Sequence, residues 1–122
     1  VFMALDVGLA RAGDKPLKIV AFGDSLTAGY MLEPSAALPI QLEAALKKRG
    51  YSVVVENAGV SGDTTAAGLA RFDWAIPTDT DAVILELGAN DALRGIDPEL
   101  TRKNLEQILE KVEELIAEAK SG

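Results

Sequence analysis

Three short runs of apolar, mostly β-branched or aliphatic residues constrain the fold of this chain more than any other feature. They are residues 17–22 (LKIVAF), 52–55 (SVVV) and 82–87 (AVILEL). Nearly continuous apolar character, in place of strict alternation, is typical of strands covered on both faces. The segments between the runs are long enough to hold helices, so the pattern predicts an α/β domain with a parallel sheet.

The segments that follow the first two runs have features of helices. Residues 36–48 carry four apolar side chains that we expect to face the sheet: Ile40, Leu42, Ala45 and Leu46. A shorter helix is expected after Asp63, with that residue as N-cap and with Leu69 and Phe72 pointing inward. Trp74 is expected to pack in the core of this second segment.

The last helix has the clearest pattern. Asp97 is placed to cap it and Pro98 to occupy its first position. Seven apolar residues then repeat at helical spacing: Leu105, Ile108, Leu109, Val112, Leu115, Ile116 and Ala119. We expect this stripe to face the sheet and the acidic residues between its members to face solvent.

Composition excludes several functional classes. The chain has 122 residues, 48% of them hydrophobic, which suits one globular domain. Its 12 basic and 19 acidic side chains give a net charge of −7, which argues against nucleic acid as a partner. Cysteine and histidine are both absent, so thiolate or imidazole metal ligands are excluded. No apolar run reaches the roughly 18 residues of a membrane-spanning helix, so no integral membrane segment is expected.

The first twelve residues differ from the rest of the chain. Residues 1–12 are mostly small and apolar and end in Ala10-Arg11-Ala12, which has the A-x-A form of a signal-peptidase site. We interpret them as a signal-peptide remnant or an N-terminal arm, and residues 13–122 as part of a single domain. The first interpretation predicts a periplasmic or secreted protein. We prefer this interpretation, although Asp6 interrupts the apolar run and no basic segment precedes it, two features that an arm would also explain.

A polar, glycine-rich loop follows each predicted strand. The loops are residues 23–29 (GDSLTAG), 57–64 (NAGVSGDT) and 88–91 (GAND). Ligands of open parallel sheets bind at the carboxyl ends of the strands, so we expect these loops to share one edge of the sheet and to form the functional site.

Three residues of these loops have the properties that acyl transfer requires. Ser25 offers a hydroxyl in a turn that leads into a helix, where unpaired N–H groups favour a developing anion. Gly62 has no side chain to block its backbone N–H, and Asn90 offers an uncharged amide donor. Taken singly, each has a structural explanation: Ser25 as a helix cap, Gly62 as a turn residue and Asn90 as an Asx-turn residue.

The same loops resemble three sequence blocks of the SGNH (GDSL-type) hydrolase family. Residues 19–30 (IVAFGDSLTAGY) are similar to block I and residues 57–65 (NAGVSGDTT) to block II. Residues 86–95 (ELGANDALRG) resemble block III of the bacterial thioesterase I, lysophospholipase and arylesterase members. The three blocks occur in the family's order.

The resemblance implies a flavodoxin-like three-layer α/β/α sandwich with a parallel sheet and no cofactor. It also implies a serine esterase that hydrolyses small acyl esters or thioesters through an acyl-serine intermediate. In that mechanism Ser25 is the nucleophile, and Gly62 and Asn90 are the oxyanion donors.

The sequence departs from the family pattern in one respect. The fourth block, a D-x-x-H segment that carries the triad aspartate and histidine, has no counterpart here. The resemblance therefore implies the N-terminal part of an SGNH domain, truncated after the third strand and following helix, and weakly active or inactive alone. We expect the strand at 82–87 to have an open edge that pairs with a second copy of the chain or with a C-terminal complementing segment.

Two further hypotheses remain open at the level of sequence. Asp24, Asp63 and Asp91 each follow a predicted strand and could together hold Mg²⁺ in a receiver-like or phosphotransfer module. Alternatively, the chain is a non-catalytic structural fragment, because it lacks a histidine base.

Overall fold

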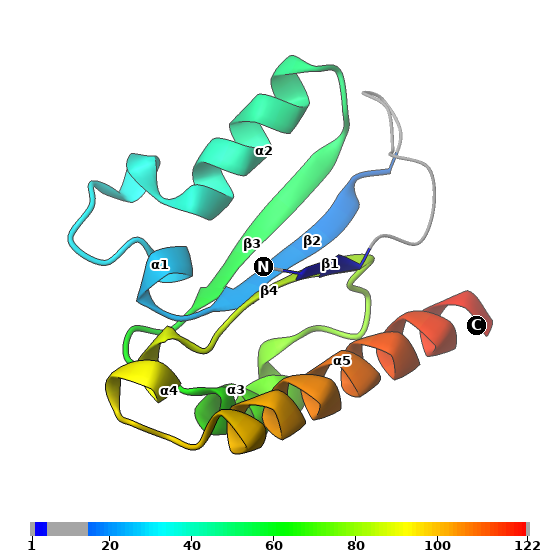
Figure 1. Ribbon diagram of the computed structural model, residues 1–122. Helices are drawn as coiled ribbons and strands as arrows, with labels where there is room; N and C mark the ends of the chain where they lie inside the picture. Colours follow the sequence, from blue (N-terminus) through cyan, green and yellow to red (C-terminus); the bar gives the residue numbers. More distant parts are fainter. Residues whose placement is uncertain (1, 5–14, 122) are drawn as a thin grey trace.

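A computed structural model describes residues 2–4 and 15–121 of the protein (Figure 1). One sheet contains four strands in the order β1-β4-β2-β3. Their bounds are β1 (Phe2–Ala4), β2 (Leu17–Gly23), β3 (Val53–Gly59) and β4 (Ala82–Glu86). The central strand β2 pairs in parallel with both β3 and β4, which confirms the predicted parallel sheet.

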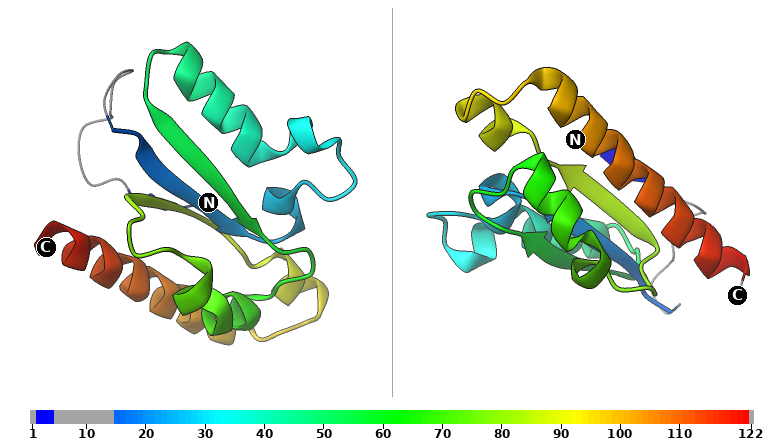
Figure 2. Two further views of the ribbon diagram at one scale, coloured as in Figure 1. Left: turned by 180° about the vertical axis from the view of Figure 1, so that it is seen from behind. Right: turned by 90° about the horizontal axis from the view of Figure 1, so that it is seen from below.

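Helices cover both faces of this sheet. Their bounds are α1 (Ser25–Ala28), α2 (Leu38–Lys48), α3 (Thr65–Ala75), α4 (Ala89–Leu93) and α5 (Pro98–Ser121), and a 3₁₀ turn, η1 (Pro34–Ala36), precedes α2. The views in Figures 1 and 2 place α2 on one face and α3 with α5 on the other. The predicted three-layer α/β/α arrangement is therefore confirmed.

The larger core lies between the sheet and the pair α3 and α5. Its buried members come from β2, β4 and the two helices: Val20, Phe22, Phe72, Ile76, Val83, Leu85, Ile108 and Val112. The Phe22 and Phe72 rings meet edge to face with centroids 5.9 Å apart. This contact fixes α3 against the carboxyl half of β2, where the functional loops begin.

The face covered by α2 corrects one prediction. Leu42 and Leu46 pack on the sheet as expected, but Ile40 and Ala45 are exposed. The reason is that α2 contacts the sheet through a narrow stripe, from which Ile40 and Ala45 point away on opposite flanks. Glu43 lies in the stripe, and its Oε1 accepts a hydrogen bond of 2.8 Å from the N–H of Val55 in β3.

Helix α3 differs from the prediction at two positions. Its N-cap is Thr64, whose side chain accepts a hydrogen bond from Ala67 N, and not Asp63. Trp74 is 78% exposed and does not enter the core. Helical spacing is the reason, because Trp74 lies two residues after the buried Phe72 and therefore points to a different side of the helix. On the inner side the packing is close, since an added Cβ at Gly68 would come within 2.5 Å of a methyl group of Leu87.

Helix α5 follows its sequence pattern. The side chain of Asp97 accepts a hydrogen bond of 2.9 Å from Glu99 N at the start of the helix. Ile108 and Val112 are fully buried in the larger core, and Ala119 at the far end is exposed. The predicted helix and its inner face are therefore confirmed over most of its length.

The edge of β4 is not open, which corrects the expectation for the strand at 82–87. Strand β1 pairs with it in antiparallel fashion, with Phe2 opposite Leu85 and Ala4 opposite Val83. An exposed edge offers unpaired N–H and C=O groups, and the N-terminal segment supplies partners for them. The Ala10-Arg11-Ala12 motif lies outside the described residues. Within residues 2–4 and 15–121, no helix is both long enough and apolar enough to cross a membrane.

Candidate active site

The three glycine-rich loops meet at one edge of the sheet. Gly23 at the end of β2 is in register with Gly59 of β3 and with Glu86 of β4. The N–H of Val60 donates a hydrogen bond of 2.9 Å to Gly23 O, which joins the first loop to the second. Figure 1 shows α1 and α4 at this same end of the sheet.

Ser25 is the first residue of α1. The helix is a single turn that ends at Gly29, which has φ +86°. The stabilisation of a developing anion by the helix dipole is therefore that of one turn only. Asp24 caps the turn, and its Oδ1 accepts a hydrogen bond of 3.0 Å from Leu26 N. Ser25 is half-buried, and its hydroxyl makes no hydrogen bond to another described residue. The backbone of the turn holds the residue in place.

Gly62 lies in the second loop with φ +88°, a conformation that favours glycine. Its carbonyl oxygen accepts a hydrogen bond of 3.1 Å from Arg94 Nη2. Its N–H makes no hydrogen bond to any residue that the structure describes. The loop therefore fixes this peptide group and leaves its donor unused.

Asn90 connects the third loop to the second. Its Nδ2 donates one hydrogen bond of 2.9 Å to Asp63 O. A side-chain amide has two N–H donors, so the second is left without a partner among the described residues. The first bond sets the orientation in which the second N–H can act.

Arg71 of α3 was not identified from the sequence. It is buried, and its Nε donates to Asp63 Oδ2 at 2.6 Å. Its Nη2 donates to Gly23 O at 3.1 Å and to Ala58 O at 2.9 Å. Its guanidinium also lies 4.2 Å from the centroid of the Phe22 ring. One side chain thus holds together the ends of β2 and β3 and the loop that contains Gly62.

Asp91 links α4 to α3 and α5. It is buried, and its two oxygens accept hydrogen bonds from Thr65 N (2.8 Å), Thr65 Oγ1 (2.6 Å) and Thr101 Oγ1 (2.8 Å). Burial by itself raises the pKa of a carboxyl group, but these hydrogen bonds outweigh it and hold the pKa of Asp91 below 3.8. Asp91 is therefore a charged anchor beside Asn90.

A second carboxyl group lies beneath the Ser25 turn. Glu86, at the end of β4, accepts hydrogen bonds at Oε1 from Thr27 Oγ1 (2.7 Å) and from Asp24 N (3.3 Å). Burial, together with the carboxyl group of Asp24, raises the pKa of Glu86. Asp24 is fully buried, and its Oδ2 has no hydrogen-bond partner.

The magnesium hypothesis is not favoured by this arrangement. Asp63 is paired with Arg71, and Asp91 is occupied by Thr65 and Thr101. In the described part of the chain, no group of three or more acidic side chains is placed to hold a metal ion. The three aspartates serve separate structural contacts.

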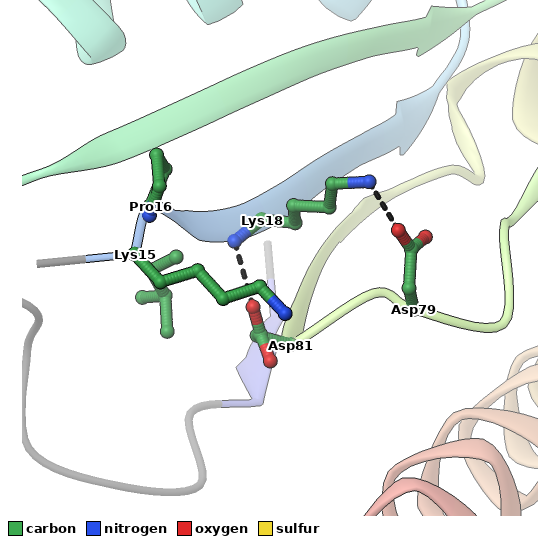
Figure 3. A pocket seen from close by; sticks show the side chains of 6 residues that line it. Lys15, Pro16, Lys18, Asp79 and Asp81 are labelled. Carbon is green, nitrogen blue, oxygen red and sulfur yellow. Dashed lines mark hydrogen bonds and ion pairs between the residues drawn. The ribbon is translucent and has the colours of Figure 1, made fainter.

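A hollow also occurs at the opposite end of the sheet, before β2 and β4. Figure 3 shows it lined by Lys15, Pro16, Lys18, Asp79 and Asp81. Lys18 forms an ion pair with Asp79, and its backbone N–H donates a hydrogen bond of 2.8 Å to Asp81 Oδ2. The predicted site residues are at the other end of the strands, so this hollow is not part of their site.

Known proteins are similar to this chain in sequence. An arylesterase of Vibrio mimicus is 39% identical over 107 residues, which are 87% of this chain and 54% of the relative. The thioesterase 1/protease 1/lysophospholipase L1 of Escherichia coli is 40% identical over 119 residues, 97% of this chain and 54% of the relative. The chain thus spans about half the length of the curated relatives it matches.

Solved structures agree with these relatives. The crystal structure of AlinE4, an SGNH-hydrolase family esterase, matches with 45% identity and a TM-score of 0.80 over 84% of this chain and 56% of that one. The sequence model of the GDSL-like Lipase/Acylhydrolase family matches residues 21–121, which include all three loops. The chain therefore belongs to the GDSL-like lipase/acylhydrolase family.

Proposed function

We propose that this chain carries the nucleophile and the oxyanion donors of a serine esterase for small acyl esters or thioesters. One observation supports this most directly. At an edge where most buried polar groups are hydrogen-bonded, the Ser25 hydroxyl and the Gly62 N–H make no hydrogen bond to a described residue. Together with the second N–H of Asn90, they are the groups that acyl transfer needs.

The chemistry follows from these three groups. The Ser25 Oγ attacks the acyl carbon while its proton passes to a base. The carbonyl oxygen becomes negative and accepts hydrogen bonds from Gly62 N–H and Asn90 Nδ2, each worth about 2.7–4 kcal/mol in the transition state. The bond to the alcohol or thiol breaks, the leaving group takes the proton, and water then hydrolyses the acyl-serine.

The base is the missing part of this proposal. A serine hydroxyl needs an adjacent base, and none of the 122 residues is a histidine. Asp63 and Asp91, which lie near the donors, are already committed to Arg71 and to two threonines. We propose that the base comes from outside these residues and that the chain alone turns over esters slowly.

The surroundings of Ser25 support an acyl substrate. Leu26 and Val60, one in each of the first two loops, are 68% and 43% exposed. Apolar side chains displayed beside a reactive hydroxyl provide a surface on which a hydrocarbon chain can rest. The relatives named as arylesterase and thioesterase are consistent with ester or thioester substrates. We also propose export to the periplasm or medium, based on the Ala10-Arg11-Ala12 motif alone; cleavage after Ala12 would remove β1 and open the edge of β4.

The test is covalent labelling of Ser25 with a fluorophosphonate, with imidazole added as an external base and the site located by mass spectrometry. Ser25→Ala should abolish labelling. Asn90→Ala should slow hydrolysis of an activated aryl ester by about 10²–10³-fold. The matched control is Ser35→Ala, which changes an exposed serine in η1 and should leave both rates unchanged.

A complementing segment provides a second readout. A separate polypeptide that contains a D-x-x-H motif should raise the ester rate by about 10²–10⁴-fold if it docks, because it supplies a positioned base. Labelling that persists in Ser25→Ala, or that appears on another residue, would contradict the nucleophile assignment and favour a non-catalytic structural role.

A further inference from the structure

We infer that Glu86 keeps a proton that it donates to the buried Asp24 Oδ2, and that this shared proton positions the turn that carries Ser25. Glu86 is thereby a positioning residue and does not itself touch the substrate. The inference rests on the proposed function only where it concerns the reactivity of Ser25.

The first observation is an oxygen atom without a partner. Asp24 is fully buried, and its Oδ1 accepts a hydrogen bond from Leu26 N, whereas its Oδ2 has no donor. A buried carboxylate oxygen without a donor is costly, and such atoms are rare in folded proteins. A neighbouring group that carries a hydrogen would satisfy this oxygen.

The second observation identifies the group that can supply it. Glu86 lies against Asp24, because its Oε1 accepts a hydrogen bond of 3.3 Å from Asp24 N. Its Oε1 already accepts hydrogen bonds from Asp24 N and Thr27 Oγ1, so the other oxygen is the one left to hold a proton. Two carboxyl groups in contact share one proton because both cannot remain charged at short range.

The surroundings offer no cation that would replace the proton. Among the described residues, Asp24 is the ionisable side chain whose charge acts on Glu86. Arg71 reaches Gly23 O, but its own charge is paired with Asp63. Space is also short: a Cβ at Gly23 would lie 2.7 Å from Glu86 Oε1, so the groups from β2, α1 and β4 are closely packed.

The pair holds the turn on both sides of Ser25. The Glu86 carboxyl group accepts a hydrogen bond from Asp24 N, and the Asp24 carboxyl group accepts one from Leu26 N. These two N–H groups belong to the residues before and after the serine. Glu86 also accepts a hydrogen bond from the hydroxyl of Thr27, in the same turn. When Glu86 loses its proton, two negative charges face each other under this turn and the hydrogen bonds must rearrange.

The pH dependence has a definite sign. Burial, followed by the effect of Asp24, places the pKa of Glu86 in the folded chain above its ordinary value of 4.5. A raised pKa means that the folded state binds the proton more tightly than the unfolded state. The stabilisation is therefore complete below pH 4.5 and is lost as the pH rises through the raised pKa.

The primary test is a pH titration by NMR of the full chain with ¹³C-labelled side-chain carboxyl groups. We expect the Glu86 carboxyl resonance to titrate above pH 4.5 and the Leu26 amide resonance to shift with the same midpoint. In Glu86→Gln the Leu26 shift should disappear from that range. Glu56→Gln is the matched control, since Glu56 is an exposed residue of β3, and it should keep the Leu26 shift. Titration of Glu86 at or below 4.5, or a Leu26 resonance that does not follow it, overturns the inference.

A second test separates this inference from the proposed function. At a pH below the Glu86 midpoint found by NMR, fluorophosphonate labelling with added imidazole should be about 10²-fold slower in Glu86→Leu, because small displacements of a reacting group cost that much. Glu86→Gln should recover most of the rate, since its amide can accept from Thr27 and donate to Asp24. Equal labelling of Glu86→Leu and the unchanged chain overturns the positioning role. Absent labelling of Ser25 in the unchanged chain overturns the nucleophile assignment and leaves the NMR result to decide the shared proton.

Discussion

The two ends of the sheet treat charged side chains differently. At the carboxyl ends of the strands, the Arg71 and Asp63 side chains are only 9% and 12% exposed, and the arginine also binds two backbone carbonyl groups. At the amino ends, the ion pair between Lys18 and Asp79 is 51% and 61% exposed. The same kind of pair thus occurs in two environments within one small domain.

The difference shows which end needs fixed geometry. Exposed pairs are screened by water and salt and contribute little, whereas a buried charge that loses its partner is strongly destabilising. Charges at the carboxyl end hold loops to one another, so the uncommitted groups of Ser25 and Gly62 keep their positions. The amino end has no such task, and its charges keep the surface hydrated.

Removing Arg71 should have the largest effect. Arg71→Met leaves the Asp63 carboxylate and the carbonyl groups of Gly23 and Ala58 without a donor, and we expect a loss of about 3–5 kcal/mol in the free energy of unfolding. Urea denaturation followed by circular dichroism measures it. Lys18→Met at the other end is the control and should change the urea midpoint very little. Similar shifts for the two variants would show that the two ends do not differ.

Asp91 should give the next largest effect. Asp91→Asn places an amide donor against the N–H and hydroxyl donors of Thr65 and Thr101, and we expect a loss of about 2–3 kcal/mol at neutral pH. The pKa of Asp91 is lowered in the folded chain, so its contribution is present above 3.8 and is lost as the pH falls through the folded value. The stability gap between the unchanged chain and the variant should narrow in acid. A gap that stays constant from pH 7 to strongly acid pH would contradict the assigned charge.

The smallest effect on stability, and the most specific effect on function, is expected at Gly62. Gly62→Ala and Gly50→Ala place alanine at nearly the same backbone angle, φ +88° and +89°, and each should cost about 1–2 kcal/mol. Gly62→Ala alone should also slow labelling of Ser25, because its Cβ enters the region that the oxyanion must occupy. Equal labelling rates in the two variants would remove Gly62 from the set of oxyanion donors.

Much of the fold could be predicted because its signals are local. The β-branched runs predict β2, β3 and β4, and the spacing from Leu105 to Ile116 predicts the inner face of α5. Strand β1 could not be predicted in this way, because three residues have no periodicity and their pairing with β4 depends on an edge made elsewhere in the chain.

Helix α3 shows why other features were missed. Periodicity places Phe72 inward, but it does not reveal how closely the helix approaches the sheet. The structure shows that Gly68 lies close to Leu87. From sequence alone, a tryptophan is expected in the core and an arginine at the surface. In the folded chain Trp74 is exposed and Arg71 is buried.

In the candidate site, too, some residues could be predicted from the sequence and some contacts could not. The loops and the positions of Ser25, Gly62 and Asn90 follow from the strand ends and from the family blocks. The supporting contacts of Arg71 and Glu86 do not, because each joins residues that are far apart in the sequence and meet only in the folded sheet.

The hydrogen bond from Val55 N to Glu43 has a consequence for the behaviour of the protein in a crowded solution. Strand β3 is the outer strand of its side of the sheet, and such strands can template the addition of a foreign strand. The Glu43 carboxylate occupies the donor that an incoming strand would use, and that hydrogen bond lowers the pKa of Glu43. Glu43 therefore keeps its charge, and continues to block this edge of β3, at a lower pH than a carboxyl group of ordinary pKa would.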